Sequence, residues 1–424
     1  MNRVEQHVIR KSHAWYDYCE RVTTTARKLY NTCNYTQRQS YFYGWGTKPQ
    51  AALDKFFKED SNYRALPAKV SQLVLKQCTD AWTSYFKALA QYKETPDKFT
   101  GKPKEPNYIE NKNLIKFNIQ AIGKKAFKQG VIHPSGSPIE IPVREELKFE
   151  DLNEVRIVPK PGCFVIEVVS EISDNNHFFC SLNSIAAAID IGLDNLAIIT
   201  FNDLSLQPLI VNGKPLKSVN RFYNKQVAKY KGFIKKGTSR RIQNITCNRN
   251  NFMNSYLHQT TKIIVDEFVR LGVTEVSIGK NEQWKTHLNL GKRNNQSFTQ
   301  IPHARFIEIL TYKLEKVGIA VLVDEESYTS RASFLDWDNI PTFDKKNRVK
   351  YIFSGKRVTR AWYVSKSGLK IHADVNGSYN IGRKSNPEAF DSLESIVRDM
   401  GCLVVHPRRI TPVFCRARDK TVVA

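Results

Sequence analysis

Cysteine is sparse in this chain, and none of it forms a recognisable metal or disulfide motif. The eight cysteines are scattered and no CxxC pair occurs. This usage is typical of free thiols in a reducing compartment and argues against a disulfide framework. The cysteines are Cys19, Cys33, Cys78, Cys163, Cys180, Cys247, Cys402 and Cys415.

Long uninterrupted apolar runs are also missing. The longest apolar stretch, residues 185–201, contains Asp190 and Asp194, which makes it a poor membrane span and a good buried strand. The first 15 residues carry no apolar core of the kind found in signal peptides. We therefore expect a cytoplasmic protein.

Acidic residues are outnumbered throughout. The chain has 41 Asp and Glu against 65 Lys and Arg, which gives a formal net charge of +24. A protein this basic repels itself unless a polyanion neutralises it, and contacts between basic side chains and phosphates release counterions. A merely solvated basic surface is one alternative. An anionic membrane is a weaker one, because no amphipathic basic helix with a free apolar face stands out.

The length and patterning indicate several domains. A chain of 424 residues with 41% hydrophobic residues can bury two or three cores. We expect a strand at 4–9, helices at 14–45 and 67–92, and an antiparallel barrel or sandwich between 112 and 172.

Strands and helices alternate from residue 185 onward. We expect strands at 185–191, 196–201, 209–211, 273–278 and 320–324, a long helical stretch at 219–271, and helices at 303–317 and from 373. Three strands, a helix, then strand, helix, strand and a closing helix is the order of an RNase H-like α/β fold.

Two segments carry acidic residues in positions that chemistry would use. Asp190 stands inside an apolar strand, Ala-Ile-Asp-Ile-Gly-Leu-Asp-Asn at 188–195, where an unpaired carboxylate costs several kcal/mol and a metal ion is a usual remedy. Asp374 stands where a helix would begin, in Asp-Val-Asn-Gly-Ser-Tyr-Asn-Ile at 374–381. A hairpin cap for Asp190 and a helix N-cap for Asp374 are the structural alternatives.

Together, the two segments resemble the first and third RuvC motifs of the TnpB (OrfB) family of insertion-sequence proteins, relatives of compact type V CRISPR effectors and of Fanzor proteins. The resemblance extends to Tyr30-Asn31, Arg38-Gln39, Gly101-Lys-Pro103, Gln300-Ile-Pro302, Tyr312-Lys313 and Tyr328-Thr-Ser330. It implies a transposon-associated, prokaryotic, nucleoid-associated endonuclease in which RuvC carboxylates hold Mg²⁺ or Mn²⁺. Two such ions would hydrolyse phosphodiester bonds of target double-stranded DNA chosen by a guide RNA from the transposon end.

The resemblance also implies a domain plan. Residues 1–12 and 112–180 would form a β-barrel (wedge) domain, and residues 13–111 a helical recognition insertion. Residues 181–385 would form the RuvC-like nuclease domain, and residues 386–424 a basic, flexible tail.

The expected second carboxylate is displaced. The family's usual glutamate ends the fourth strand of the RuvC fold, where this chain has Gly279. The fifth strand lies about 4.8 Å from the fourth in such a sheet, so a glutamate at its end could lean across. We rank Glu326 first as the replacement, Glu325 second and Glu282 third. The alternative is that Glu325 and Glu326 are simply solvated.

The family's zinc knuckles are missing as well. Ser333 and Asp336 stand at the positions of the first cysteine pair, and no cysteine lies between Cys247 and Cys402. We therefore expect no zinc and a degenerate zinc-ribbon-like insert at about 327–372.

A basic stretch without acids, between Asp203 and Asp266, is the expected contact for the guide–target duplex. A solvated helix face is the alternative, weakened because no acids are interspersed. The expected binding residues, including two that follow Gly279, are Lys225, Lys229, Lys231, Lys235, Lys236, Arg240, Arg241, Arg249, Lys280 and Lys285. Aromatic and basic residues at 30–45 could stack on bases, although core packing suits most of them.

Two other functions are compatible with parts of this pattern. A DDE transposase shares the fold and the metals but normally presents its last carboxylate, a glutamate, on a late helix. A nuclease-dead, RNA-guided DNA-binding repressor is the stronger rival, supported by Gly279 and opposed by the presence of both Asp190 and Asp374.

Overall fold

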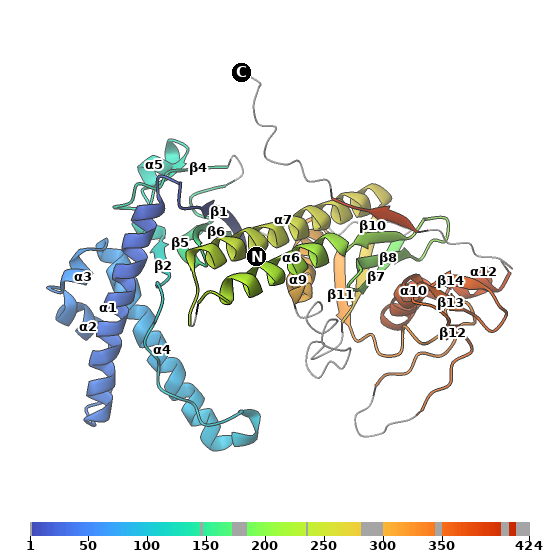
Figure 1. The fold of residues 1–424 in the computed structure, drawn as a ribbon, viewed down its shortest axis with the longest axis horizontal. Coiled ribbons are helices and arrows are strands. Elements are labelled where there is room, and N and C mark those ends of the chain that lie inside the picture. The colour runs from blue at the N-terminus through green and yellow to red at the C-terminus, as the bar shows by residue number, and fades with distance from the viewer. Residues whose placement is uncertain are drawn as a thin grey trace. The chain divides into compact units, whose positions relative to one another are not determined.

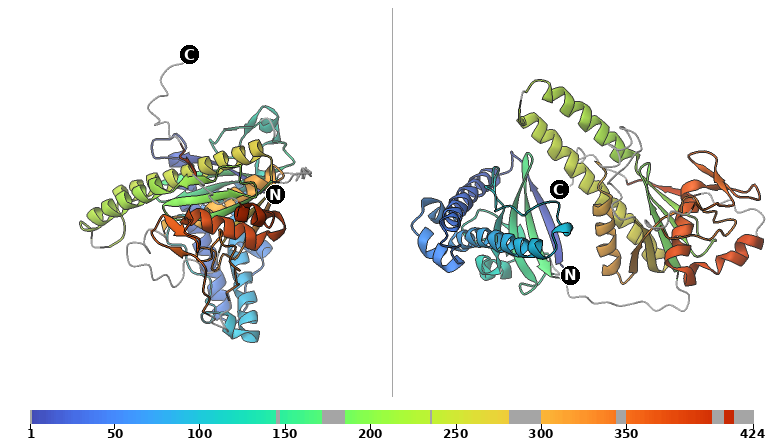
Figure 2. Two further views of the ribbon diagram at one scale, coloured as in Figure 1. Left: turned by 90° about the vertical axis from the view of Figure 1, so that its right-hand side faces the viewer. Right: turned by 90° about the horizontal axis from the view of Figure 1, so that it is seen from below.

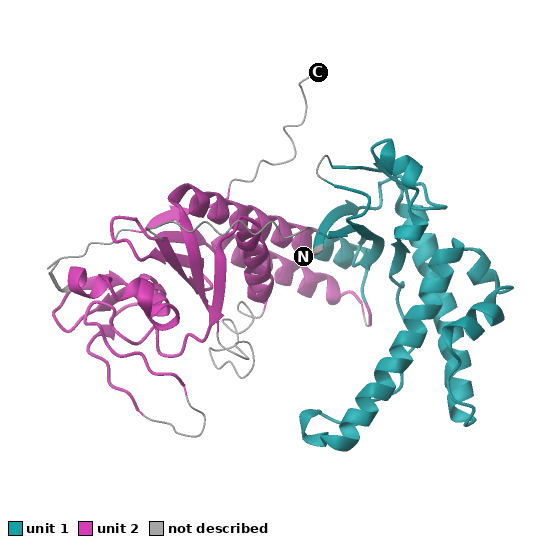
Figure 3. Cartoon of the chain, turned by 180° about the vertical axis from the view of Figure 1, so that it is seen from behind, with its two compact units in different colours: residues 1–174, 238–247 teal, residues 175–237, 248–424 magenta. Residues whose placement is uncertain are grey.

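A computed structural model describes residues 2–144, 147–171, 185–234, 236–280, 300–343, 350–399 and 407–412 (Figure 1). The chain forms two compact units (Figure 3). Unit 1 comprises residues 1–174 and 238–247, and unit 2 comprises residues 175–237 and 248–424. Within the described residues, no helix combines the length and apolar character that a membrane span requires.

Two long helices dominate the helical part of unit 1, and both were predicted. Buried side chains recur every three or four residues along α1, as in Val22, Ala26 and Leu29, so one stripe of the helix faces the core. Val70 and Val74 do the same on α4. The helices are α1 (Tyr16–Phe42), α2 (Gln50–Phe57), α3 (Ser61–Arg64), α4 (Ala68–Glu94), α5 (Lys124–Lys128) and the 3₁₀ turns η1 (Pro96–Lys98) and η2 (Ile119–Ala121).

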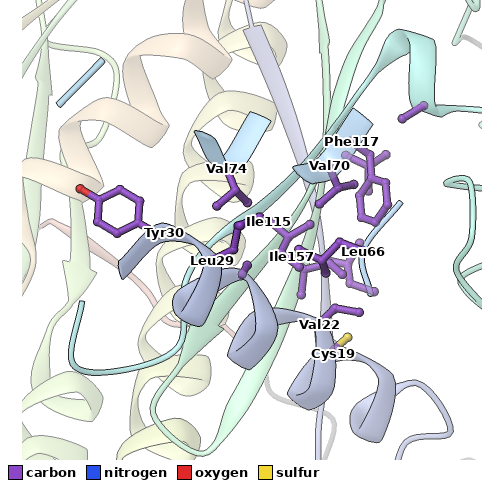
Figure 4. Packing of buried hydrophobic residues seen from close by; sticks show 14 of the residues in the cluster. Cys19, Val22, Leu29, Tyr30, Leu66, Val70, Val74, Ile115, Phe117 and Ile157 are labelled. Atoms are coloured by element: carbon purple, nitrogen blue, oxygen red, sulfur yellow. The ribbon is translucent and has the colours of Figure 1, made fainter. Parts of the chain in front are cut away.

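An antiparallel sheet forms the rest of unit 1. Its order is β1-β6-β5-β2, from β1 (Asn2–Ile9), β6 (Cys163–Glu171), β5 (Leu152–Lys160) and β2 (Ile115–Asn118). A separate two-stranded sheet pairs β3 (Val131–Ile132) with β4 (Ile141–Pro142). Among the described strands, β1 and β2 remain two separate edges, so the expected barrel is seen as an open sheet. Leu29, Ile115 and Ile157 belong to one hydrophobic cluster, so helices and sheet share a single core (Figure 4).

A six-stranded mixed sheet is the centre of unit 2. Its order is β11-β10-β7-β8-β9-β15, with β8 antiparallel to both neighbours and β10 and β11 parallel to β7. The strands are β7 (Ile185–Ile191), β8 (Asn195–Phe201), β9 (Leu209–Asn212), β10 (Val273–Gly279), β11 (Ala320–Asp324) and β15 (Arg408–Ile410). The five predicted strands and their order are confirmed. Because β7, β10 and β11 are parallel, their C-terminal ends meet at one edge.

Helices cover both faces of this sheet (Figure 2). Ile189 of β7 packs with residues of α7 and α9, whereas Ala188 packs with residues of α10, since alternate side chains of a strand point to opposite faces. The helices are α6 (Lys214–Lys231), α7 (Arg240–Leu271), α9 (His303–Lys316) and α10 (Ala373–Ser385). The helical stretch predicted at 219–271 is two helices, because glycines at 232 and 237 (φ +81° at Gly237) interrupt it.

Two further segments differ from a simple domain plan. The insert at 327–372 carries a small sheet of β12 (Lys356–Arg357), β13 (Trp362–Val364) and β14 (Lys370–His372). The stretch expected as a flexible tail, 386–424, contains α11 (Pro387–Phe390), α12 (Leu393–Asp399) and β15. Residues 387–399 form helices because Phe390, Leu393 and Val397 are buried in the same core cluster as residues of α10.

Candidate active site

Asp190 projects from the face of β7 that α10 covers. Its neighbours Ile189 and Ile191 face the opposite core, so the alternation of the strand directs Asp190 toward α10. A Cβ atom on Gly377 of α10 would lie 3.0 Å from Oδ2 of Asp190. Gly377 therefore leaves the room that this carboxylate uses.

Asp374 lies in the first turn of α10, two residues after the capping position at His372. Its carboxylate is held from two other segments. Asn195, the first residue of β8, donates from Nδ2 to Oδ2 of Asp374 at 3.0 Å. Arg357 of β12 donates from Nη2 to Oδ1 at 3.1 Å, which makes an ion pair. The carboxylate is thus oriented by tertiary contacts rather than by a cap.

Glu326 fills the space in which a side chain on Gly279 would lie. Ile278 pairs with Ile189, so Gly279 ends β10 at the level of Asp190. A Cβ atom on Gly279 would lie 2.8 Å from Oε2 of Glu326. Glu326 follows β11 by two residues, and it therefore brings a carboxylate to the place where β10 itself offers none.

The negative charges at this edge of the sheet disfavour one another. Burial raises the pKa of Asp190 well above its ordinary value, and the nearby charges of Glu326 and Asp374 raise it further, with Arg357 opposing them. Burial, followed by the charge of Glu325, raises the pKa of Glu326 to about 7. The edge therefore favours either protons or a bound cation.

Glu325 is committed elsewhere. Its carboxylate forms an ion pair with Lys384 of α10 and accepts a 2.8 Å hydrogen bond from the backbone N–H of Ser327. The third candidate, Glu282, lies outside the described residues. Of the three proposed replacements, the structure brings Glu326 to Asp190.

The carboxylates of Asp190, Glu326 and Asp374 offer oxygen atoms, which are the ligands that a hard divalent cation prefers. In the part of the chain that the structure describes, however, no three His, Cys, Asp or Glu side chains converge closely enough to enclose an ion as they stand. Arg357 occupies one oxygen of Asp374. A cation would therefore have to compete with this guanidinium for Asp374.

Other positive side chains surround the site. Asp194, four residues after Asp190, forms ion pairs with Lys217 and Arg360, and these lower its pKa in spite of burial. Nothing in the sequence marked Arg357 or Arg360, because they are two of 65 basic residues in a segment without a motif. Only the fold of the insert brings them to Asp374 and Asp194.

The expected nucleic-acid contacts fall into two groups. Arg249 is half-buried: it donates to Oδ1 of Asn220 at 2.8 Å and to the carbonyl of Gln300 at 2.7 Å, and burial lowers its pKa, so it holds the fold together. Lys235 and Lys285 lie outside the described residues. The remaining residues are exposed on α6, on α7, in the turn between them, or after β10: Lys225, Lys229, Lys231, Lys236, Arg240, Arg241 and Lys280.

A second group of carboxylates lies in the insert. Ser333 donates from Oγ to Oδ2 of Asp336 at 2.6 Å, and the backbone N–H of Lys366 donates to the same oxygen at 2.9 Å. Asp338 accepts from the backbone N–H groups of Ser333 and Ser354 at 2.8 and 3.0 Å, and from Oγ of Ser354 at 2.6 Å. These bonds tie together three segments of the insert without thiolates.

Two family models match the chain across these features. Residues 181–285 match OrfB_IS605, described as a probable transposase, and include Asp190 and Gly279. Residues 303–381 match the Cas12f1-like TNB domain and include Glu326 and Asp374. No curated protein sequence matches the chain.

Several solved structures are similar over most of the chain. A Cas12f1–sgRNA–target DNA complex aligns at 17% identity and a TM-score of 0.34, covering 91% of this chain and 100% of that one. A CRISPR-Cas12f ternary complex aligns at 15% and 0.34 (88% and 81% covered), and an AacC2c1–sgRNA binary complex at 10% and 0.37 (80% and 64%). The two family models cover both halves of the candidate site, and over these residues the chain is similar to the OrfB_IS605 transposases and to the Cas12f1-like TNB domain.

Proposed function

We propose that this protein is a transposon-associated, RNA-guided DNA endonuclease whose RuvC-type site is formed by Asp190, Glu326 and Asp374. The observation that carries the proposal is the position of Glu326, whose Oε2 lies in the side-chain space of Gly279, at the level of Asp190. In the six-stranded mixed sheet, β7, β8 and β9 are antiparallel and β10 and β11 run parallel to β7, which is the RNase H-like order and supports a RuvC assignment.

The three carboxylates would hold Mg²⁺ or Mn²⁺. When bound, such ions activate a water and stabilise the leaving oxygen of a phosphodiester. The protein's own part is to concentrate negative charge and keep it poorly solvated, as the raised pKa values of Asp190 and Glu326 indicate. Asn195 orients Asp374 through a hydrogen bond that a cation need not displace.

Guide RNA and target DNA are the proposed partners. The similar Cas12f1 structure is a complex with sgRNA and target DNA, and the net charge of +24 favours binding to a polyanion. The exposed lysines of α6 and the basic residues at the start of α7 would contact the phosphate backbone. In this proposal residues 1–12 and 112–180 act as the wedge domain and residues 13–111 as the recognition insertion.

Guided cleavage tests the proposal directly. The protein is purified with its transposon-end RNA, and cleavage of a plasmid carrying the guide-matched target is measured in Mg²⁺ beside target binding. We expect the parent to cut, and Asp190→Ala to bind the target normally while cutting at least about 10²-fold more slowly, as for loss of a metal ligand. Equal cleavage by both proteins would refute the site.

A nuclease-dead repressor is the second candidate, and two observations favour it. Gly279 removes the usual carboxylate from β10, and Arg357 pairs with Asp374. Under this alternative the parent binds the guide-matched target tightly and never cuts it, in Mg²⁺ or Mn²⁺. The same assay therefore separates the two functions.

A further inference from the structure

The end of α1 and the turn that follows it lie in a stretch without acidic residues. No Asp or Glu occurs between Glu20 and Asp54, a span that contains Arg21, Arg27, Lys28, Arg38 and Lys48. Such a stretch attracts a polyanion rather than an acidic or neutral surface.

Two large aromatic rings stand exposed at this place. We call residues 43–48, which follow α1, the aromatic turn. The side chains of Tyr43 and Trp45 are 67% and 77% exposed, and their rings are stacked with centroids 5.3 Å apart and planes at 26°. Leaving both rings in water forgoes the gain of burying them, so packing does not explain their presence.

Buried polar side chains fix the shape of the aromatic turn. Gln37 donates from Nε2 to the carbonyl of Lys48 at 2.8 Å and accepts from the N–H of Lys48 at 2.7 Å. Ser40 donates from Oγ to the carbonyl of Gly46 at 2.6 Å. Gln37 and Ser40 are 0% and 4% exposed, so both are committed to holding a surface turn.

Glycine makes the same turn possible. Gly44 and Gly46 have φ values of +78° and +70°, a backbone region that other residues rarely adopt. Together with the bonds of Gln37 and Ser40, they fix the backbone from which Tyr43 and Trp45 project. The turn therefore resembles a preorganised binding platform rather than a loop with stray apolar residues.

Basic residues lie near the aromatic turn in the sequence, at Arg38 and Lys48. The guanidinium of Arg38 lies 5.3 Å from the ring centre of Phe42 and 5.7 Å from that of Tyr108, and Lys48 belongs to the turn itself. Stacked rings next to basic side chains are the arrangement with which proteins hold unpaired bases, because every base offers a π-face and each nucleotide brings a phosphate.

We propose that Tyr43 and Trp45 form a stacking site for an unpaired base of the bound RNA. The inference rests on the proposed function insofar as RNA is the resident partner. RNA is the better occupant because its loops and ends splay bases out, whereas the bases of a DNA duplex stay stacked on one another. A second copy of the chain or a protein partner would not require the acid-free surroundings.

The test compares binding of a fluorescein-labelled single-stranded RNA by the full-length parent protein, Trp45→Ala, Tyr43→Ala and Trp45→Phe. Phe56→Ala is the matched control, because Phe56 is an aromatic side chain of the same unit with 63% exposure. We expect Trp45→Ala and Tyr43→Ala to weaken RNA binding about ten-fold, and Trp45→Phe and Phe56→Ala to bind within about two-fold of the parent. RNA should also quench part of the parent's tryptophan emission, and Trp45→Phe should lose this quenching.

The outcomes separate the stacking site from the proposed function. A parent that binds no RNA overturns the proposed function and this inference with it. A parent that binds RNA and cuts its target, with Trp45→Ala indistinguishable from it, overturns the stacking site alone. The stacking site is also overturned if Trp45→Ala or Tyr43→Ala weakens binding of single-stranded DNA but not of RNA. It is overturned as well if the parent is a dimer and either variant is a monomer. Unchanged melting temperatures exclude misfolding as the cause of a loss.

Discussion

Two groups of carboxylates in unit 2 have opposite surroundings. At the edge of the large sheet, burial raises the pKa of Asp190, and the charges of Glu326 and Asp374 raise it further, while burial and the charge of Glu325 raise the pKa of Glu326 to about 7. In the insert, Asp336 and Asp338 receive hydrogen bonds from backbone N–H groups and serine hydroxyls. In the first group the buried carboxylates of Asp190 and Glu326 have raised pKa values, which a proton or a cation would offset, whereas the second group accepts several hydrogen bonds from the protein itself.

The difference separates chemistry from architecture. A carboxylate supplied with donors is a structural element, since its charge is already stabilised at no further cost. A carboxylate buried beside other carboxylates destabilises the folded protein. Such an arrangement is typical of a functional site, where a bound ligand offsets the cost. The following changes test this distinction, beginning with the largest expected effect.

Removing the charge of Glu326 should abolish cleavage, whereas the same change at the adjacent Glu325 should be tolerated. Glu326→Gln keeps the shape of the side chain, and we expect guided plasmid cleavage to fall about 10²-fold or more, as for a metal ligand. Glu325→Gln is the matched control, because Glu325 pairs with Lys384 instead. If Glu325→Gln is the more damaging change, the assignment of Glu326 is wrong.

Filling the space at Gly279 should displace the carboxylate without removing it. In Gly279→Ala the new Cβ would lie 2.8 Å from Oε2 of Glu326 and 2.5 Å from Cδ1 of Ile381. We expect slower cleavage by at least ten-fold and a loss of about 1–3 kcal/mol in stability from overpacking. Adding Ile381→Val, which removes Cδ1, should restore melting temperature but not cleavage. Full activity of Gly279→Ala would mean that Glu326 does not work from this position.

The insert should depend on its hydrogen bonds and not on a metal. Asp338→Asn replaces one acceptor oxygen by a donor that faces other donors, and we expect the free energy of unfolding to fall by about 1–3 kcal/mol. Glu388→Gln, an exposed change on α11, serves as the control. A zinc-selective chelator should leave the melting temperature of the parent unchanged. Stoichiometric zinc in elemental analysis would contradict this interpretation of the insert.

Neutralising Glu326 should stabilise the metal-free protein at alkaline pH. Its pKa is raised to about 7 from an ordinary value near 4.5, so the folded state holds a proton that the unfolded state releases. Stability therefore falls as pH rises from about 4.5 through 7. We expect Glu326→Gln to melt a few degrees higher than the parent at pH 8, and at the same temperature at pH 4, by calorimetry in chelator. A difference that is the same at both pH values would exclude an ionisation effect.

Releasing Asp374 from Arg357 should have the smallest effect. Arg357→Ala removes a partly exposed ion pair, so Mn²⁺ affinity measured by titration calorimetry should rise only a few-fold. Arg360→Ala is the control, because Arg360 pairs with Asp194. Weaker Mn²⁺ binding in Arg357→Ala would show that the guanidinium supports the site rather than competing for it.

Much of unit 2 could be predicted from sequence because its signals are local. Apolar runs around Asp190 specify a buried strand, and the order of strands and helices specifies the sheet. The interruption of the helix near Gly232 and the helices after Asn386 were missed, since the first depends on two glycines within a polar stretch and the second on burial of a few apolar residues.

The candidate site was less accessible to sequence reasoning. Glu325 and Glu326 are adjacent, and only the fold shows that one meets Lys384 and the other meets Gly279. Arg357 carries no signal at all, because its relation to Asp374 depends on the fold of β12. The catalytic roles of Asp190, Glu326 and Asp374 stay predictions until cleavage is measured.

The pairing of β15 with β9 has a practical consequence for handling this protein. Residues 408–410 lie beside 209–211 and cover one edge of the large sheet, while Arg408 forms an ion pair with Glu267. An uncovered edge strand offers unpaired backbone groups to other chains and promotes aggregation. Shortened versions of the chain should therefore keep residue 410, because removing residues 408–424 would save only 17 residues and would expose the backbone groups of β9 to aggregation.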